Sequence, residues 1–301
     1  MNRLKLARLL LSFVKRLPRR YPVHSRTEQL PFFILNAGRS GSTLLNRILN
    51  EHPKLGLPTE QYFLGPAIFK YHFYNYMIWR DLMQVIVGEL WDQRKHTWEL
   101  DLQAVIREII DLPKRNRSLV QMVDQLFRHV VDKPRWGDST PLNVFYYKEL
   151  YHLYPKAKYI FLIRDGRDVV ASYKNGGEAA FGELAQVEES TARWLIHAKA
   201  MNWYKQRTQI LEVSYEAFMK DPDQQLTLIC QFLEIEEMPR DWRNYTEHVP
   251  SAEFFEPSHH DAVRSTPFMD SIGKWKSVLS ESEAEYCQGI MSAQLKKYGY
   301  L

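Results

Sequence analysis

The most constraining feature of this sequence is a short apolar run that leads directly into a glycine-containing turn and then an amphipathic helix. The run Phe32 to Leu35 is continuously apolar, which is typical of a strand buried on both faces of a parallel sheet. Gly38 and Gly41 follow, and apolar residues then recur at helical spacing through position 49. We therefore expect a strand, a tight loop and a helix that begins at about Ser42.

A loop of this kind binds anions. Its glycines let backbone N–H groups approach an oxyanion, and the helix N-terminus adds unpaired N–H groups and the positive end of its dipole. The side chains that can donate further hydrogen bonds are those of Arg39, Ser40, Ser42 and Thr43. A nucleotide kinase or ATPase loop carries four residues between its glycines and then a lysine, whereas two residues separate them here and no lysine follows. The alternative is a Ser/Gly turn that only caps the helix.

A second unit with the same organisation lies at residues 158–173. The apolar run Tyr159 to Ile163 is followed by a charged turn that starts at Arg164, and then by a helical pattern. Ser172 comes eight residues after Arg164, so both side chains could reach one phosphate. The alternative is that the charges at 164–168 form only a local salt-bridged turn.

The rest of the chain alternates between strand-like and helix-like patterns. A third apolar run covers Ile210 to Val213. Helical periodicity covers approximately residues 61–91, 99–131, 142–154, 181–207, 222–234 and 281–298. Strands separated by helices predict an α/β fold with a parallel sheet. Because the 301-residue chain has no repeat and no linker, we expect a single domain over residues 26–301.

We expect residues 1–25 to form a separate, basic amphipathic helix. Seven Lys and Arg residues lie in the first twenty positions without an acidic residue among them. The segment is too short and too charged to span a bilayer, and it lacks the small-residue cleavage site of a signal peptide. Two readings stay open: an anchor on anionic lipid, or a helix packed on the domain and solvated on its other face.

Composition excludes several classes of protein. A net charge of +4 is modest for 301 residues and does not imply a nucleic-acid partner. The two cysteines, Cys230 and Cys287, have neither zinc-site spacing nor the density of a disulfide framework. We therefore expect a reducing, cytoplasmic location, with peripheral membrane association left open. No cluster has metal-ligand spacing, since adjacent side chains such as His259 and His260 diverge on regular backbone.

Taken in order, these motifs resemble those of the sulfotransferases that use 3′-phosphoadenosine 5′-phosphosulfate (PAPS), particularly the branch with tyrosylprotein sulfotransferases and bacterial relatives. The resemblance covers about residues 31–276 and implies a P-loop-like parallel sheet flanked by helices, the sulfotransferase fold. It also implies a metal-free transfer that releases 3′-phosphoadenosine 5′-phosphate (PAP). The stretch from Arg39 to Leu44 matches the family's 5′-phosphosulfate loop. Arg164 with Ser172 matches its 3′-phosphate motif in residue type and spacing.

The resemblance also assigns residues outside these two loops. Tyr215 occupies the place of a nucleotide-contacting tyrosine, and Ser265 and Lys274 match a late loop that closes over the cofactor. Glu60 agrees in its spacing from Arg39 with the family's catalytic glutamate, which would accept the acceptor's proton. His72 and His96 are the alternative bases, and capping of a helix is the alternative role for Glu60.

Two positions depart from the family's pattern. Ser139 stands where the family often has a lysine, so Arg39 or Lys274 would have to supply the positive charge at the transferred group. A further basic residue is expected where Gly176 stands, which leaves Lys174 as a substitute.

Three functions are compatible with the sequence. The first is sulfuryl transfer to an acceptor hydroxyl of a carbohydrate, lipid, peptide tyrosine or small molecule. The alternatives are an ATP-dependent phosphotransferase and a non-catalytic protein that binds PAP or sulfated ligands. The missing phosphate-loop lysine disfavours the phosphotransferase, and Glu60 disfavours the binding protein.

Overall fold

A five-stranded parallel sheet forms the centre of the molecule, as the computed structural model shows for residues 2–14, 19–24, 30–60, 62–92, 101–243 and 271–301. The strand order is β2-β3-β1-β4-β5. The strands are β1 (Phe32–Leu35), β2 (Leu55–Gly56), β3 (Arg135–Asp138), β4 (Lys158–Ile163) and β5 (Ile210–Ser214). The predicted α/β fold with a parallel sheet is confirmed.

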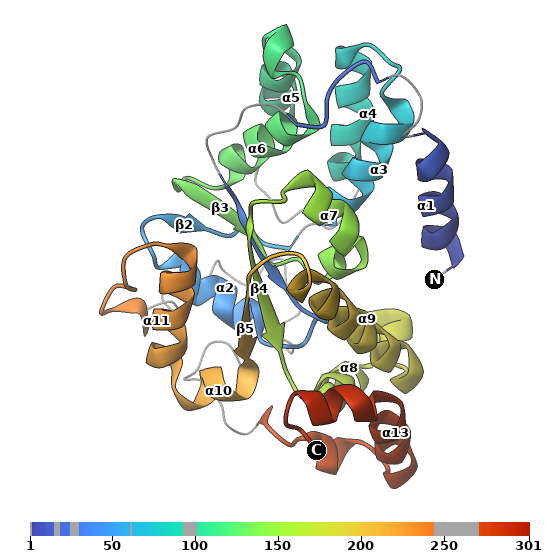
Figure 1. Cartoon of the computed structure of the whole chain (residues 1–301), viewed down its shortest axis with the longest axis vertical. Helices are drawn as coiled ribbons and strands as arrows, with labels where there is room; N and C mark the ends of the chain where they lie inside the picture. Colours follow the sequence, from blue (N-terminus) through green and yellow to red (C-terminus); the bar gives the residue numbers. More distant parts are fainter. Residues whose placement is uncertain (1, 15–18, 25–29, 61, 93–100, 244–270) are drawn as a thin grey trace.

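Helices cover both faces of this sheet (Figure 1). The α-helices are α1 (Asn2–Val14), α2 (Ser42–Asn50), α3 (Leu64–Tyr74), α4 (Trp79–Asp92), α5 (Leu102–Ile110), α6 (Leu119–Val130), α7 (Tyr147–Leu153), α8 (Gly166–Phe181), α9 (Val187–Lys205), α10 (Tyr215–Lys220), α11 (Pro222–Leu233), α12 (Trp275–Val278) and α13 (Glu281–Lys297). Short 3-10 helices are η1 (Lys114–Asn116), η2 (Pro141–Tyr146) and η3 (Gly182–Ala185).

Strand β1 is apolar at every position because it is buried on both sides. Phe33 and Leu35 belong to a core cluster with α3, α4, α6, α7 and α9, whereas Phe32 and Ile34 belong to one with α2, α10 and α11. Alternate side chains of a strand point to opposite faces, so two cores need a continuous apolar run. A third cluster joins α8, α9 and α13.

The strand order places the two predicted loops side by side. Strands β1 and β4 are parallel neighbours, with Leu35 opposite Phe161. After β1 the chain passes to β2 and β3 on one side, and only then to β4 and β5 on the other. The carboxyl ends at such a switch point diverge into a crevice where α/β proteins bind ligands.

Two strands and several boundaries differ from the prediction. β2 and β3 were not predicted, because β2 has two residues and the sequence of β3 is Arg-Trp-Gly-Asp, which has no apolar run. The helical pattern over 61–91 corresponds to α3 and α4, and the pattern over 99–131 to α5 and α6. The pattern over 181–207 begins as a helix only at Val187, after η3.

The N-terminal helix α1 is packed on the domain by one charged contact and one buried side chain. Arg8 donates two hydrogen bonds of 2.8 Å to the Glu149 carboxylate and one to the Phe145 carbonyl, and Leu11 is buried. Other apolar residues of α1 stay exposed, namely Leu6, Leu9, Leu10 and Phe13. Among the described residues, no helix combines the length and the apolarity that crossing a membrane requires.

A substitution at Gly137 of β3 tests the packing between β3 and β1. A Cβ atom there would lie 2.4 Å from the ring of Phe32, which is fully buried in β1. Gly137→Ala is therefore expected to destabilise the protein by about 1–3 kcal/mol through overpacking. The control is Gly289→Ala, at an exposed position of α13 where an added Cβ atom would have nothing within 4 Å. This variant should gain about 0.5–1 kcal/mol of folding stability. Urea denaturation measures both, and equal stability of the two variants would contradict this description of the core.

Candidate active site

The loop after β1 is wound in a left-handed conformation that requires its glycines. Gly38, Arg39 and Gly41 have φ angles of 78°, 52° and 91°. A Cβ atom on Gly38 would lie 2.0 Å from the Tyr173 hydroxyl, and one on Gly41 would lie 2.6 Å from the ring of Tyr215. Both positions therefore exclude a side chain.

Asn36 and Ser40 hold the loop in this shape. The Asn36 amide donates to the Ser139 carbonyl at 3.0 Å, and its Oδ1 atom accepts from the Gly38 N–H at 2.8 Å. The buried Ser40 hydroxyl donates to the Gly38 carbonyl at 3.0 Å. Ser40 is thus engaged within the loop, and its backbone N–H is the group left to contribute to anion binding.

The N-terminus of α2 opens directly at this loop. Gly41 is its N-cap and has no side chain to accept the first-turn N–H groups, which leaves donors and a positive dipole end for an anion. Ser42 is buried there and Thr43 is partly exposed. Leu44 packs into the core cluster beneath α2, so it can contribute only backbone atoms to the site.

Two arginines link the first loop to the second. Arg39 Nε donates to the Ser172 hydroxyl at 3.1 Å, and Arg164 Nη1 donates to the Arg39 carbonyl at 2.9 Å. The Arg39 guanidinium lies 5.1 Å from the Phe181 ring centroid, and burial lowers its pKa. An arginine stays charged under such burial, so the structure brings two cations and Ser172 together at the β1–β4 crevice.

Arg164 is also the residue that meets Tyr215. Its guanidinium lies 4.6 Å from the Tyr215 ring centroid, and its buried Nε atom has no hydrogen-bond partner in the described part of the chain. Its Nη2 group donates to the Ser271 carbonyl, and the Ser271 hydroxyl lies 2.7 Å from the Tyr215 hydroxyl. Tyr215 and the segment that begins at Ser271 therefore close over Arg164.

The salt-bridged turn predicted as an alternative exists, but it does not include Arg164. Arg167 pairs with Asp165 at 2.8 Å. Asp168 accepts the N–H groups of Gly273 and Trp275 at 2.8 and 2.9 Å, and so fixes the late segment. Of the charged residues in this turn, Arg164 is therefore the one available to bind a ligand between the ends of β1 and β4.

The other predicted residues are exposed, paired with another residue or buried, or they fall outside the described chain. Lys274 is exposed at the start of α12, and its side chain makes no hydrogen bond or ion pair among the described residues. Lys174 is paired with Glu283 at 2.6 Å, and His72 is buried in α3. Ser265 and His96 fall within residues that the structure does not describe.

Glu60 is held near the loop by the polar face of α2. Asn50 exchanges two hydrogen bonds of 2.8 Å with the backbone of Leu57. Asn46 donates to the Pro58 carbonyl at 3.1 Å and to the Ser139 hydroxyl at 2.9 Å. We did not predict either asparagine as a positioning residue, although their i, i+4 spacing on one helical face is a signal that sequence contains.

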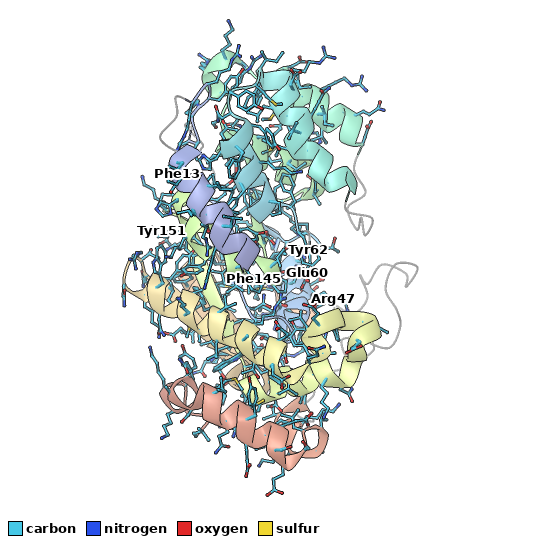
Figure 2. All side chains as sticks on the ribbon, turned by 90° about the vertical axis from the view of Figure 1, so that its right-hand side faces the viewer. Phe13, Arg47, Glu60, Tyr62, Phe145 and Tyr151 are labelled. Atoms are coloured by element: carbon cyan, nitrogen blue, oxygen red, sulfur yellow. The ribbon has the colours of Figure 1, made fainter. Side chains whose placement is uncertain are left out.

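The environment of Glu60 brings the pKa of its carboxyl group close to neutrality. Burial foremost, and then the nearby Asp138, raise its pKa from 4.5 to about 7, while Arg193 and Arg39 oppose the rise. Figure 2 shows Glu60 beside Tyr62, whose own pKa is raised by burial and by Glu60. A carboxylate half-ionised near pH 7 suits proton transfer.

Arg193 of α9 is a charged residue of the site that sequence reasoning missed. It is 9% exposed, and its Nε atom donates to the Ala37 carbonyl at 2.8 Å. His197, one turn later, bonds to the Leu35 carbonyl at 3.1 Å, and burial lowers its pKa to about 4, which keeps it neutral. Helix α9 therefore contacts the end of β1 at two points. In sequence, Arg193 is only one charge within a long helical pattern.

The described residues contain no group of three or more His, Cys, Asp or Glu side chains that could hold a metal ion. Cys230 and Cys287 are both buried free thiols.

Residues 31–240 match the model of the sulfotransferase family. This chain belongs to that family. It is 23% identical to a protein-tyrosine sulfotransferase of Drosophila melanogaster over 71% of the chain, which is only 40% of that relative's length. It is 26% identical to protein-tyrosine sulfotransferase A of Caenorhabditis elegans, over 90% of this chain and 67% of that protein.

Solved structures confirm the sulfotransferase fold. The sulfotransferase domain of the Synechococcus PCC 7002 olefin synthase matches with a TM-score of 0.58 and 20% identity, over 91% of this chain and 98% of that one. Mouse sulfotransferase SULT7A1, solved in complex with PAP, matches with a TM-score of 0.52 and 14% identity, over 90% and 86% of the two chains.

The raised pKa of Glu60 predicts how the folding stability of the protein depends on pH. Because the folded-state pKa of about 7 exceeds the ordinary 4.5, folding favours the protonated form. Stability should fall as pH rises from about 4.5 to about 7 and then level off. Glu60→Gln removes this loss, so the variant should become more stable than the parent by about 1–3 kcal/mol at pH 8 and match it near pH 4. Denaturant unfolding across this pH range measures the difference. Glu285→Gln, at an exposed position of α13, is the control. If Glu60→Gln is instead less stable than the parent at pH 8, Glu60 has a helix-capping role.

Proposed function

We propose that this protein transfers the sulfuryl group of PAPS to an acceptor hydroxyl. The observation that carries the proposal is the linkage of two anion-binding loops at the β1–β4 crevice, through Arg39 with Ser172 and Arg164 with the Arg39 carbonyl. A nucleotide with phosphates at both its 5′ and 3′ positions needs two such sites.

The residues present fit that donor. Arg164 keeps a buried, unpaired Nε donor within the described chain, and a charged donor of this kind gains most from an anionic acceptor. The uncapped start of α2 supplies backbone N–H groups for a second anion. Arg164, Ser172 and Tyr215 would hold the 3′-phosphate side of the nucleotide, and residues 39–43 its 5′ side. Ser265 and Lys274 of the late segment stay proposals on resemblance alone.

The chemistry then requires charge stabilisation and one proton transfer. PAPS supplies a sulfuryl group bonded to a phosphate leaving group, and its transfer is analogous to phosphoryl transfer, in which positioning and electrostatics dominate. Arg39 and the loop amides stabilise the phosphate as it leaves. Glu60 accepts the proton of the acceptor hydroxyl. None of these steps assigns a role to a metal ion.

The acceptor class stays open within this proposal. The named relatives act on protein tyrosine, yet they are only 23 to 26% identical to this chain, and Ser139 departs from the family's pattern. Carbohydrate, lipid, peptide tyrosine and small alcohol are the candidates to be separated by experiment.

Transfer of label from radioactive PAPS tests the activity. When wild-type protein is incubated with radioactive PAPS and fractionated host extract, we expect one fraction to acquire the label. The compounds in that fraction identify the acceptor class. Glu60→Gln should lower turnover about 10²- to 10⁴-fold with PAP affinity nearly unchanged, whereas Arg39→Ala should lower both. Absence of labelled product from every fraction, with PAP still bound, would favour the non-catalytic alternative.

We also propose that α1 rests on an anionic membrane surface. Leu6, Leu9, Leu10 and Phe13 leave an apolar face 49 to 60% exposed, and Lys5, Arg19 and Arg20 are exposed basic residues of the same segment. Figure 2 shows α1 along the outside of the molecule, with Phe13 near one end. An amphipathic helix with basic flanks binds anionic lipid by this combination.

Replacing the apolar face tests the membrane proposal. Leu9→Gln with Phe13→Gln should lower binding to phosphatidylserine vesicles at low salt at least about tenfold, because it removes exposed apolar area that the membrane would bury. Point variants are preferable to deletion, since deletion would leave the buried Glu149 carboxylate without Arg8. Leu228→Gln, an exposed leucine of α11, is the control. Wild-type protein that ignores these vesicles would exclude the anchor.

A further inference from the structure

We propose that Arg193 supplies the positive charge that stabilises the transferred sulfuryl group, in place of the lysine that this chain lacks at Ser139. This inference rests on the proposed sulfuryl transfer. It adds a catalytic residue that neither loop motif contains.

The position of Ser139 leaves a charge deficit in the site. The Ser139 side chain is buried, and its hydroxyl accepts from Asn46. Its neighbours are acidic: the buried Asp138 carboxyl group accepts from the Thr140 N–H and the Asn143 amide, and Glu60 lies close enough for the two carboxyl groups to interact. A group that arrives here with negative charge on its oxygens needs a cation nearby.

Arg193 is the cation best placed to meet that need. Of the positive groups that lower the pKa of Glu60, Arg193 has the larger effect and Arg39 the smaller. Among the described residues Arg39 uses only its Nε atom, toward Ser172 at 3.1 Å, but the proposed function already assigns Arg39 to the leaving phosphate. Arg193 uses only its Nε atom, toward the Ala37 carbonyl, and within the described chain its Nη1 and Nη2 groups donate to no protein acceptor. Those groups are therefore available to an anionic ligand between the loop and Glu60.

The fold also holds Arg193 rigidly. Its guanidinium lies 5.3 Å from the Phe145 ring centroid, and the Ala37 carbonyl fixes its Nε atom. His197 anchors the next turn of α9 to Leu35. A charge fixed in advance needs no reorganisation when negative charge develops, which is the condition for strong electrostatic catalysis.

Binding measurements test the proposal without an acceptor. PAPS and PAP differ only in the sulfuryl group, so Arg193→Gln should weaken PAPS binding about tenfold or more relative to PAP, because one charge-assisted contact is lost. Lys199→Gln removes an exposed charge from the same helix and should leave the ratio of the two dissociation constants unchanged. An unchanged ratio in Arg193→Gln would overturn the proposal.

Turnover and rescue separate a catalytic role from a structural one. Arg193→Gln should lower the label-transfer rate constant about 10²- to 10³-fold while PAP affinity changes less than about threefold. Guanidinium ion at millimolar concentration should partly restore Arg193→Ala, and Ser139→Lys should raise the rate of Arg193→Gln at least about tenfold. Loss of PAP affinity and of melting temperature together, without guanidinium rescue, would make Arg193 only a loop anchor. Failure of the wild type to transfer label would refute the proposed function instead, and the PAPS-to-PAP ratio would still decide where Arg193 acts.

Discussion

The arrangement of the site depends on the reciprocal contact between the loops that follow β1 and β4. The side chain of the first loop's Arg39 reaches Ser172 of α8, and Arg164 of the second loop reaches the backbone of Arg39. Neither contact could form unless β1 and β4 were parallel neighbours in register. The sheet therefore determines how two anion-binding loops, 125 residues apart in the chain, become one site. Tyr215, which follows β5, completes it by packing on Arg164 and Gly41.

The site places charges where they reduce stability. Glu60 and Asp138 are carboxyl groups in partly desolvated surroundings, and burial raises the pKa of both. The arginines nearby are fixed to loop backbone or hydroxyl groups, so their charges are not neutralised by direct ion pairs with these acids. Such an arrangement is unfavourable for folding and useful for chemistry, because a base near neutrality and unneutralised cations can act on a bound anionic group. The apolar cores on both faces of the sheet hold it in place.

The sequence predicted the parts of this architecture that short-range patterns encode. Continuous apolar runs located β1 and β4, and a mostly apolar run interrupted by Glu212 located β5; the glycines and arginines after β1 and β4 located both loops. β3 was missed because Trp136 is the only large apolar residue in its sequence Arg-Trp-Gly-Asp, while Gly137 leaves space for Phe32. Arg193 and Asn46 were missed because their roles come from tertiary contacts with Ala37 and Pro58. The exposed position of Lys274 was likewise not encoded locally.

The most direct test of the two-loop site is whether the protein distinguishes a 3′-phosphate and does so through Arg164. Calorimetry should compare PAP with 5′-AMP and with ATP–Mg²⁺, in wild type, Arg164→Met and Arg167→Met. Arg167, paired with Asp165 in the same turn, is the matched control. Wild type and Arg167→Met should bind PAP at least about a hundredfold more tightly than 5′-AMP, as expected for two or more charge-assisted hydrogen bonds. Arg164→Met should lose most of that preference. Equal affinity of the wild type for PAP and 5′-AMP, or tighter binding of ATP–Mg²⁺, would contradict the account.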